Sequence, residues 1–172
     1  MSKTLYIVRG IPGSGKSTFV KEHSASVEGD FIVHSTDDVV ENEFAPQYVG
    51  EGGIEGYKKF FQYVSDNKAF NLLGATHQKN FKNSCISMDK GIESVYIDNT
   101  NLKPWEPKKY VEYGISKGYD VKIHTIHPEG FTPEMSFERN VHGVPKNVID
   151  GMFKKMENHP NITVEEILQA KG

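Results

Sequence analysis

The stretch from Arg9 to Thr18, RGIPGSGKST, holds glycine, lysine and hydroxyl residues in the spacing G-x-x-x-x-G-K-[ST]. In such a loop the glycines let backbone N–H groups turn toward phosphate oxygens, the lysine reaches the β- and γ-phosphates, and the hydroxyl after it coordinates Mg²⁺. We therefore expect ATP and Mg²⁺ as cofactors. The residues expected to hold the nucleotide are Gly10, Gly13, Ser14, Gly15, Lys16, Ser17 and Thr18, of which Lys16 is also a catalytic candidate. The loop alone does not distinguish a kinase from a switch, a motor or a plain ATP-binding module.

Two adjacent carboxylates, Asp37 and Asp38, follow an apolar run in the stretch FIVHSTDDVV. At the end of a strand in a parallel sheet, a carboxylate would lie on the same edge as the phosphate loop and could accept a proton from an attacking hydroxyl. The structural alternative is that Thr36 caps a following helix while both aspartates stabilise its positive N-terminus. We favour the role of general base for Asp37, whereas both interpretations are compatible for Asp38.

A third acid, Asp98, ends the apolar run in VYIDNTN. A carboxylate in this place would meet the coordination shell of Mg²⁺, so Ser17 and Asp98 are the expected metal-binding residues. Asn99, Thr100 and Asn101 add polar groups at the same edge. For Asn99 and Asn101, an Asx-turn that closes the strand is the alternative.

Arginine is scarce in this chain, which has 18 lysines but only Arg9 and Arg139. The rigid fork of arginine suits phosphate. Arg139 lies in SFERNVHGVP, and we expect the segment 132–146 to form a lid that brings this arginine over the β- and γ-phosphates. A surface ion pair with a neighbouring glutamate is the alternative. Arg9 ends a central strand, where we expect an ion pair with a strand-end acid and no catalytic role.

Short apolar runs bounded by Gly, Asp or Asn must position these residues. The expected strands are Thr4–Arg9, Asp30–His34, Ser94–Asp98 and Val121–Ile126. Helical patterns are expected from the phosphate loop to about His23, at Asp38–Glu43, at Ile54–Asn83 with a break, and at Pro104–Lys117. This alternation predicts an α/β fold of the P-loop NTPase class, with a parallel sheet of about four strands, helices on both faces and ligands at the carboxyl ends of the strands.

The C-terminal third is predicted to be helical and to include the lid. Thr132 and Pro133 are typical of an N-cap and first helical residue, with Gly143 as the stop, and a short helix is expected after Pro145. Thr163 and Glu166 are typical of a capping box for a terminal helix. Because the sequence shows no repeat and no linker-like stretch, we expect residues 1–172 to form a single kinase-like domain.

Composition narrows the function classes. The chain is 37% hydrophobic and 25% charged, as in soluble globular proteins, and no apolar run approaches the about 20 residues that span a bilayer. We expect no membrane segment and no signal peptide, because the start MSKTLYIVRG enters a strand directly. The single cysteine, Cys85, fits a reducing cytoplasm and a half-buried helix position. A net charge of −3 argues against coating nucleic acid by bulk charge.

The stretch from Tyr57 to Phe70, YKKFFQYVSDNKAF, is rich in aromatic residues and lysine. It could stack on single-stranded nucleic acid, but we favour an amphipathic helix that buries its aromatic residues and exposes its lysines. A polynucleotide would then be held by a few lysines, such as Lys58, Lys59 and Lys68, and its binding would be weak and only modestly dependent on salt.

Taken together, GIPGSGKST, STDD, NTNL and RNVHGVP resemble the P-loop polynucleotide 5′-kinase family, which includes phage end-healing kinases and their cellular relatives. The resemblance covers about residues 4–157. It implies that Lys16 and Ser17 contact the phosphates and metal, that Asp37 is the general base toward a 5′-hydroxyl, and that Arg139 is the lid arginine.

The chain departs from this family at several positions. Val40 stands where phage kinases carry an arginine that holds the substrate phosphate, Asp98 lies one place earlier than the corresponding acid, and His142 lies near the place of a second basic lid residue. No D-x-D-G-T phosphatase motif and no N-K-x-D guanine motif occur in the sequence. We expect an ATP-dependent kinase acting on the 5′-hydroxyl of a polynucleotide. The alternatives are a kinase of nucleosides or other small molecules, or an ATP-binding switch without kinase activity.

Overall fold

The computed structural model describes residues 2–172, and over this part of the chain the core is one parallel sheet. Its strands are β1 (Thr4–Gly10), β2 (Phe31–His34), β3 (Ser94–Asp98) and β4 (Asp120–Ile126), in the order β2-β3-β1-β4. β1 lies in the centre, with Val8 opposite Asp98 of β3 on one side and opposite His124 of β4 on the other. The predicted strands are therefore confirmed, each bound lying within about one residue of its expected place.

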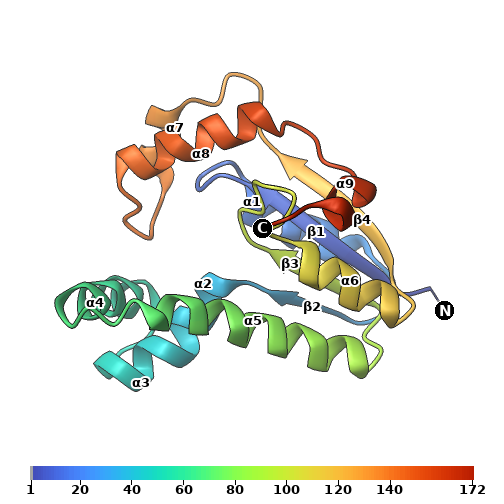
Figure 1. Ribbon diagram of the computed structural model, residues 1–172, viewed down its shortest axis with the longest axis horizontal. Coiled ribbons are helices and arrows are strands. Elements are labelled where there is room, and N and C mark those ends of the chain that lie inside the picture. Colours follow the sequence, from blue (N-terminus) through green and yellow to red (C-terminus); the bar gives the residue numbers. More distant parts are fainter. Residues whose placement is uncertain (1) are drawn as a thin grey trace.

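Helices cover both faces of the sheet, as predicted (Figure 1). The helices packed on it include α1 (Lys16–Ser26), α5 (Asn71–Asp89), α6 (Lys108–Ser116) and α9 (Val164–Gln169). Because side chains alternate along a strand, Leu5 and Ile7 pack with the apolar residues of α5, α6 and α9. Tyr6 and Val8 point to the opposite face and pack with Val20 of α1. The α/β P-loop fold follows from this arrangement.

A helical segment lies between β2 and β3 at the carboxyl edge of the sheet. Its parts before α5 are α2 (Thr36–Val39), the π-helical turn η1 (Val40–Phe44), α3 (Ala45–Val49) and α4 (Gly53–Asp66). The predicted break in the long helical pattern separates α4 from α5, where Lys68 has a left-handed φ of 51°. The structural alternative, in which Thr36 caps this helix, is wrong by one residue, because the hydroxyl of Ser35 accepts the N–H of Asp38 at 3.0 Å.

The segment 132–146, which the sequence predicts to be a lid, contains α7 (Pro133–Arg139) and the loop after it, and α8 (Lys146–Asn158) follows. Thr132 caps α7 as predicted, but the helix ends at Arg139 instead of Gly143, since the backbone of Asn140 is extended. α8 is longer than the short helix expected there, and its buried side chains pack with Ile11 beside the phosphate loop. Figure 1 shows α7 and α8 on one side of the carboxyl edge, with α2 to α4 on the other.

Two further helix ends test the sequence prediction. α6 begins at Lys108 rather than Pro104, because residues 104–107 form a turn and Pro107 is the N-cap. Thr163 caps α9 as predicted, accepting the N–H of Glu166 at 3.1 Å. In residues 2–172, no helix combines the length and the apolar character needed to cross a membrane.

Candidate active site

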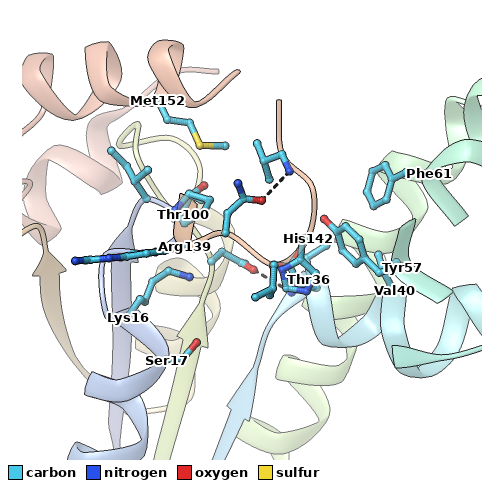
Figure 2. A pocket seen from close by; sticks show the side chains of 18 of the residues that line it. Lys16, Ser17, Thr36, Val40, Tyr57, Phe61, Thr100, Arg139, His142 and Met152 are labelled. Atoms are coloured by element: carbon cyan, nitrogen blue, oxygen red, sulfur yellow. Dashed lines mark hydrogen bonds and ion pairs between the residues drawn. The ribbon is translucent and has the colours of Figure 1, made fainter. Parts of the chain in front are cut away.

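A cavity of about 600 Å³ lies at the carboxyl edge of the sheet, between the phosphate loop, α2, α4 and the lid. This volume lies within the range of about 300–1,000 Å³ that is usual for ligand pockets. The predicted site residues that line it are Gly13, Gly15, Lys16, Ser17, Thr18, Asp37 and Arg139. The structure therefore brings the phosphate loop, the candidate base and the lid arginine together at one cavity, as Figure 2 shows for Lys16, Ser17 and Arg139.

The phosphate loop has the backbone conformation that its glycines permit. Gly13 and Gly15 are left-handed, with φ of 77° and 98°, and α1 begins directly after Gly15. The hydroxyl of Ser14 is buried and has no hydrogen-bond partner within residues 2–172. Ser14 is not among the residues that line the cavity, and its Oγ lies against Gly10, so the structure does not place this predicted nucleotide-binding side chain in the cavity lining. The N–H of Gly10 instead donates to the carbonyl of Thr100 at 3.1 Å, so this glycine does not present its N–H to the cavity.

Lys16 and Asp98 form an ion pair behind the cavity. The Nζ of Lys16 lies 2.8 Å from Oδ1 of Asp98, and the two side chains are only 17% and 13% exposed. Ser17 is exposed on the first turn of α1. No cluster of three or more His, Cys, Asp or Glu side chains in residues 2–172 could hold a metal ion by itself. Of the two predicted metal-binding residues, Ser17 lines the cavity, whereas Asp98 is not among its lining residues and pairs with Lys16.

Asp37 and Asp38 lie in different environments. Asp37 lines the cavity with its side chain 52% exposed, and its Oδ2 lies 3.8 Å from Nδ1 of His142. Asp38 is not among the residues that line the cavity, and burial, followed by the charges of Glu41 and Asp98, raises its pKa. Burial and then the charge of Asp37 raise the pKa of Tyr57 far above its usual range, so Tyr57 stays a neutral phenol beside Asp37. Of the two aspartates, Asp37 is therefore the one that lines the cavity.

The lid contacts both sides of the cavity. On the phosphate side, Ser136 Oγ donates to the carbonyl of Pro12 at 2.6 Å and Arg139 Nη1 donates to the carbonyl of Gly13 at 3.4 Å. On the other side, Nε2 of His142 lies 2.7 Å from Oε1 of Glu41. Arg139 forms no ion pair within residues 2–172, so the structure does not show the surface pair considered for it. A single short segment therefore connects the phosphate loop to α2 and η1, the elements that carry Asp37 and Glu41.

Polar groups after β3 divide into two sets. Asn99 Oδ1 accepts the backbone N–H of Thr36 at 2.9 Å, and Asn99 and Thr100 line the cavity. Asn101 is buried, with a left-handed φ of 47°, and its Nδ2 donates to the carbonyl of Val8 at 2.8 Å. Asn101 thus holds the strand end in place, while Asn99 and Thr100 belong to the cavity.

Arg9 forms no ion pair with a strand-end acid, contrary to the prediction. Its guanidinium is fully buried and donates to the carbonyls of Asn101, Leu102 and His159 at 2.8–2.9 Å and to the hydroxyl of Thr125 at 3.0 Å. No carboxylate of residues 2–172 lies within ion-pair distance of it, and burial lowers its pKa. Backbone carbonyls supply the compensation for the buried charge. Arg9 therefore ties β1 to the loop after β3, to β4 and to the end of α8.

The sequence analysis did not predict Tyr57 and Phe61, which lie opposite the phosphate loop, as site residues. α4 is the predicted amphipathic helix, and Phe60 and Val64 are buried on its inner side. Tyr57 and Phe61, however, line the cavity. Tyr57 and Phe61 are spaced i, i+4 and so lie on one stripe of the helix, next to the buried stripe of Phe60 and Val64. A second aromatic stripe beside the buried one is the feature of the sequence that could have predicted these residues as part of the site.

The structure shows the surroundings of Lys58, Lys59 and Val40, the residues that the sequence analysis connected with binding of the acceptor. Lys59 pairs with Glu51, and Lys58 Nζ lies 3.9 Å from a carboxylate oxygen of Glu55. Val40 is 1% exposed, packs in the cluster that contains Phe60, and also lines the cavity. An arginine in place of Val40 would have to leave an apolar cluster to reach the cavity, and its charge would be costly to bury there.

Comparisons with known proteins agree with this architecture. The family model that matches residues 5–158 is described as an AAA domain. NEDD4-binding protein 2 of Homo sapiens is 28% identical over 165 residues, which cover 93% of this chain and 8% of that protein. A chain from the structure of the Pnkp1/Rnl/Hen1 RNA repair complex is 18% identical with a TM-score of 0.57, over 92% of this chain and 45% of that chain. This chain thus spans a small part of the human relative and less than half of the solved chain, whose likeness shows the fold.

Proposed function

The chain belongs to the AAA domain family, whose model it matches over residues 5–158, and from this premise we propose that it is an ATP-dependent kinase. The hydroxyl that receives the γ-phosphate is proposed to be the 5′-hydroxyl of a polynucleotide. One observation carries the proposal: Asp37 and the phosphate loop, which lie far apart in the sequence, line one cavity. A kinase needs a base that faces both the phosphates and an acceptor pocket, whereas an ATP switch needs only a positioned water.

In the proposed reaction, Asp37 accepts the proton of the acceptor hydroxyl while the hydroxyl oxygen forms a bond to the γ-phosphorus. The bond between this phosphorus and the oxygen bridging to the β-phosphate breaks, and ADP leaves. Lys16 and Arg139 contact the phosphate oxygens and stabilise the charge that develops during transfer. Mg²⁺, held by Ser17 and Asp98, would neutralise phosphate charge when bound.

Two acceptor classes deserve testing. The solved neighbour is part of an RNA repair complex, which favours a polynucleotide. Val40, where the phage kinases carry an arginine, favours a nucleoside or another small alcohol as the second candidate.

The test is the transfer of labelled γ-phosphate from ATP to a panel of 5′-hydroxyl DNA and RNA oligonucleotides, nucleosides and small alcohols. We expect Asp37→Asn to keep ATP binding but to lower transfer by about 10²–10⁴-fold, since an amide cannot accept the proton. Asp38→Asn is the matched control, and we expect it to stay active. ATP hydrolysis with no labelled acceptor would reject the kinase in favour of the switch, and loss of transfer in Asp38→Asn alone would move the base to Asp38.

A further inference from the structure

An aromatic wall faces the phosphate loop across the cavity. It consists of Tyr57 and Phe61 on successive turns of α4, and their ring centroids lie 4.7 Å apart. His142 of the lid packs on the other side of Tyr57, with a centroid distance of 4.3 Å. In Figure 2, Tyr57, Phe61 and His142 lie across the cavity from Lys16, Ser17 and Arg139.

The aromatic wall leaves an aromatic ring accessible beside the candidate base. The core of the α4 region is filled by neighbouring residues such as Phe60 and Val64, which are 0% and 2% exposed. Phe61 is nevertheless 37% exposed and lines the cavity. Apolar side chains that line a pocket next to a few polar groups are typical of a ligand subsite. The position of Phe61 therefore needs an explanation that the core does not provide.

This side of the cavity carries no positive side chain. The lining residues that α2, η1, α4 and α5 contribute are Thr36, Asp37, Val40, Tyr57, Phe61, Leu73, Thr76 and His77. Within residues 2–172, the lysine and arginine of the lining are Lys16 and Arg139, which belong to the phosphate loop and the lid. Burial lowers the pKa of His77, which favours its neutral form. The wall is thus suited to an uncharged group and offers no cation to an acceptor phosphate.

The aromatic wall also lies next to the place of reaction. His142 contacts both groups: its ring centroid lies 4.3 Å from that of Tyr57, and its Nδ1 lies 3.8 Å from Oδ2 of Asp37. The candidate base and the first ring of the wall are therefore neighbours. A hydroxyl at Asp37 would therefore carry its attached group along Tyr57 and Phe61. In a 5′-hydroxyl nucleoside, that attached group includes a flat, uncharged aromatic base.

We propose, on the premise of the kinase function above, that Tyr57 and Phe61 form a subsite for the base of the acceptor nucleoside. The terminal nucleoside is held by stacking and apolar contact, and phosphates of a longer strand lie outside this part of the cavity. Because every nucleobase has an aromatic face, such a subsite tolerates different bases. The acceptor class is then a free nucleoside or the 5′-terminal nucleoside of a strand.

The experiment compares two 5′-hydroxyl oligonucleotides that differ only in whether the terminal nucleotide carries its base or is abasic. Initial rates of transfer give kcat/KM for the wild type and for Phe61→Ala. We expect the wild type to lose about tenfold on removal of the base, the scale of one base stacked on an aromatic ring. Phe61→Ala should lose a similar factor on the intact strand and show little further loss on the abasic one.

Controls separate this subsite from general damage. Phe70→Ala removes an aromatic ring that is 59% exposed between α4 and α5 and is not part of the cavity lining, so it should keep the wild-type preference for the intact strand. Phe61→Leu keeps apolar volume while removing the aromatic face, and should show an intermediate preference. Thermal unfolding of each variant confirms that the proteins compared are folded.

A second measurement uses a nucleoside and its 3′-monophosphate as acceptors for the wild type. Similar KM values support a subsite without a phosphate contact, whereas a much lower KM for the 3′-monophosphate would overturn it. The same preference for the intact strand in the wild type and in Phe61→Ala would also overturn the subsite while leaving the kinase standing. Transfer to no acceptor at all would overturn the kinase function and the subsite with it.

Discussion

Lys16 and Ser17 are adjacent in sequence but have different surroundings. Lys16 is mostly buried and pairs with Asp98, whereas Ser17 is exposed on the first turn of α1. The proposed chemistry needs both, because one contacts phosphate oxygens and the other contacts the metal. The effects of removing them on activity and on stability should therefore differ.

We predict that Lys16→Ala and Ser17→Ala each lower phosphoryl transfer by at least about 10²-fold, as loss of a charge-stabilising contact does at other enzymes. Ser17→Ala should change the free energy of unfolding by less than about 0.5 kcal/mol, as is usual for surface substitutions. Lys16→Ala should unfold at a lower temperature, because Asp98 loses its partner. Labelled transfer and thermal unfolding measure these effects. Lys21→Ala, an exposed lysine on the same helix, is the control. Full activity in either site variant would remove the phosphate loop from the mechanism.

The residue types of a motif could be predicted from the sequence, but the partners of single residues could not. Arg9 shows this difference. Its strand-end position and its charge are visible in the sequence, and both favoured an acid as its partner. The partners are instead three backbone carbonyls and a hydroxyl, contributed by segments that lie far along the chain. Because every residue has a carbonyl, no residue type marks such an acceptor.

Among the elements, the lid is the one whose contacts bear on function. α7 is fixed to the phosphate loop by the hydrogen bonds of Ser136 and Arg139, and the loop after it carries His142 to Glu41. This loop is closed by Asn140, whose Oδ1 accepts the N–H of Val144 at 2.9 Å. The lid therefore connects the nucleotide side to the wall that carries Asp37.

We predict that His142→Ala lowers kcat by about tenfold, the scale of a hydrogen bond to a charged group, while the KM for ATP changes little. The contacts of α7 with the phosphate loop remain in this variant, so ATP binding is preserved. If His142 acts through Glu41, the double variant His142→Ala/Glu41→Ala should lose no more activity than the single variants. Steady-state kinetics on all three proteins measure this coupling, with His159→Gln as the histidine control. A loss in the double variant equal to the sum of the losses in the two single variants, in free-energy terms, would show that His142 does not act through Glu41.

The elements differ in how well the sequence predicts them. Strands were predicted closely because apolar runs bounded by Gly, Asp or Asn mark their ends. Helix ends in the lid were predicted less well, since Gly143 signalled a stop but the chain leaves the helix at Arg139 and turns toward Glu41. The contact that draws the loop across the cavity joins residues 101 positions apart. Local sequence carries no signal for such a contact.

Across the whole molecule, several histidines share one electrostatic property. Burial lowers the pKa values of a set that is spread over the sheet, α5 and the loop before the lid, namely His34, His77, His124 and His127. His124 has a further distinction, because its Nε2 is buried and has no hydrogen-bond partner within residues 2–172. Its ring packs among Tyr6, Phe19 and His23. These environments favour neutral imidazole.

This property predicts how the free energy of unfolding depends on pH. An unfolded histidine binds a proton below about pH 6.5, whereas a folded histidine with a lowered pKa binds one only at lower pH. The contribution of these histidines to stability is therefore complete above about pH 6.5 and is lost as the pH falls through their folded pKa values. We expect the urea concentration at the unfolding midpoint to decrease as the pH is lowered from 7.5 to 5. Most carboxylates are still ionised in this range, so the histidines account for the decrease.

His124→Phe isolates the contribution of one histidine to this loss. Phenylalanine keeps a ring among Tyr6, Phe19 and His23 but has no nitrogen to protonate, and it leaves no unpartnered polar atom in the cluster. It also removes the repulsion between His124 and His23, which contributes to the lowered pKa of His124. We expect the variant to lose less stability than the wild type on going from pH 7.5 to pH 5, so that its advantage grows as the pH falls. Urea unfolding at pH 7.5, 6.5, 5.5 and 5 measures the difference, and His159→Gln, at the end of α8, should follow the wild-type curve. Parallel curves for His124→Phe and the wild type would show that His124 contributes nothing to the pH dependence, and would assign it to the other histidines whose pKa values are lowered.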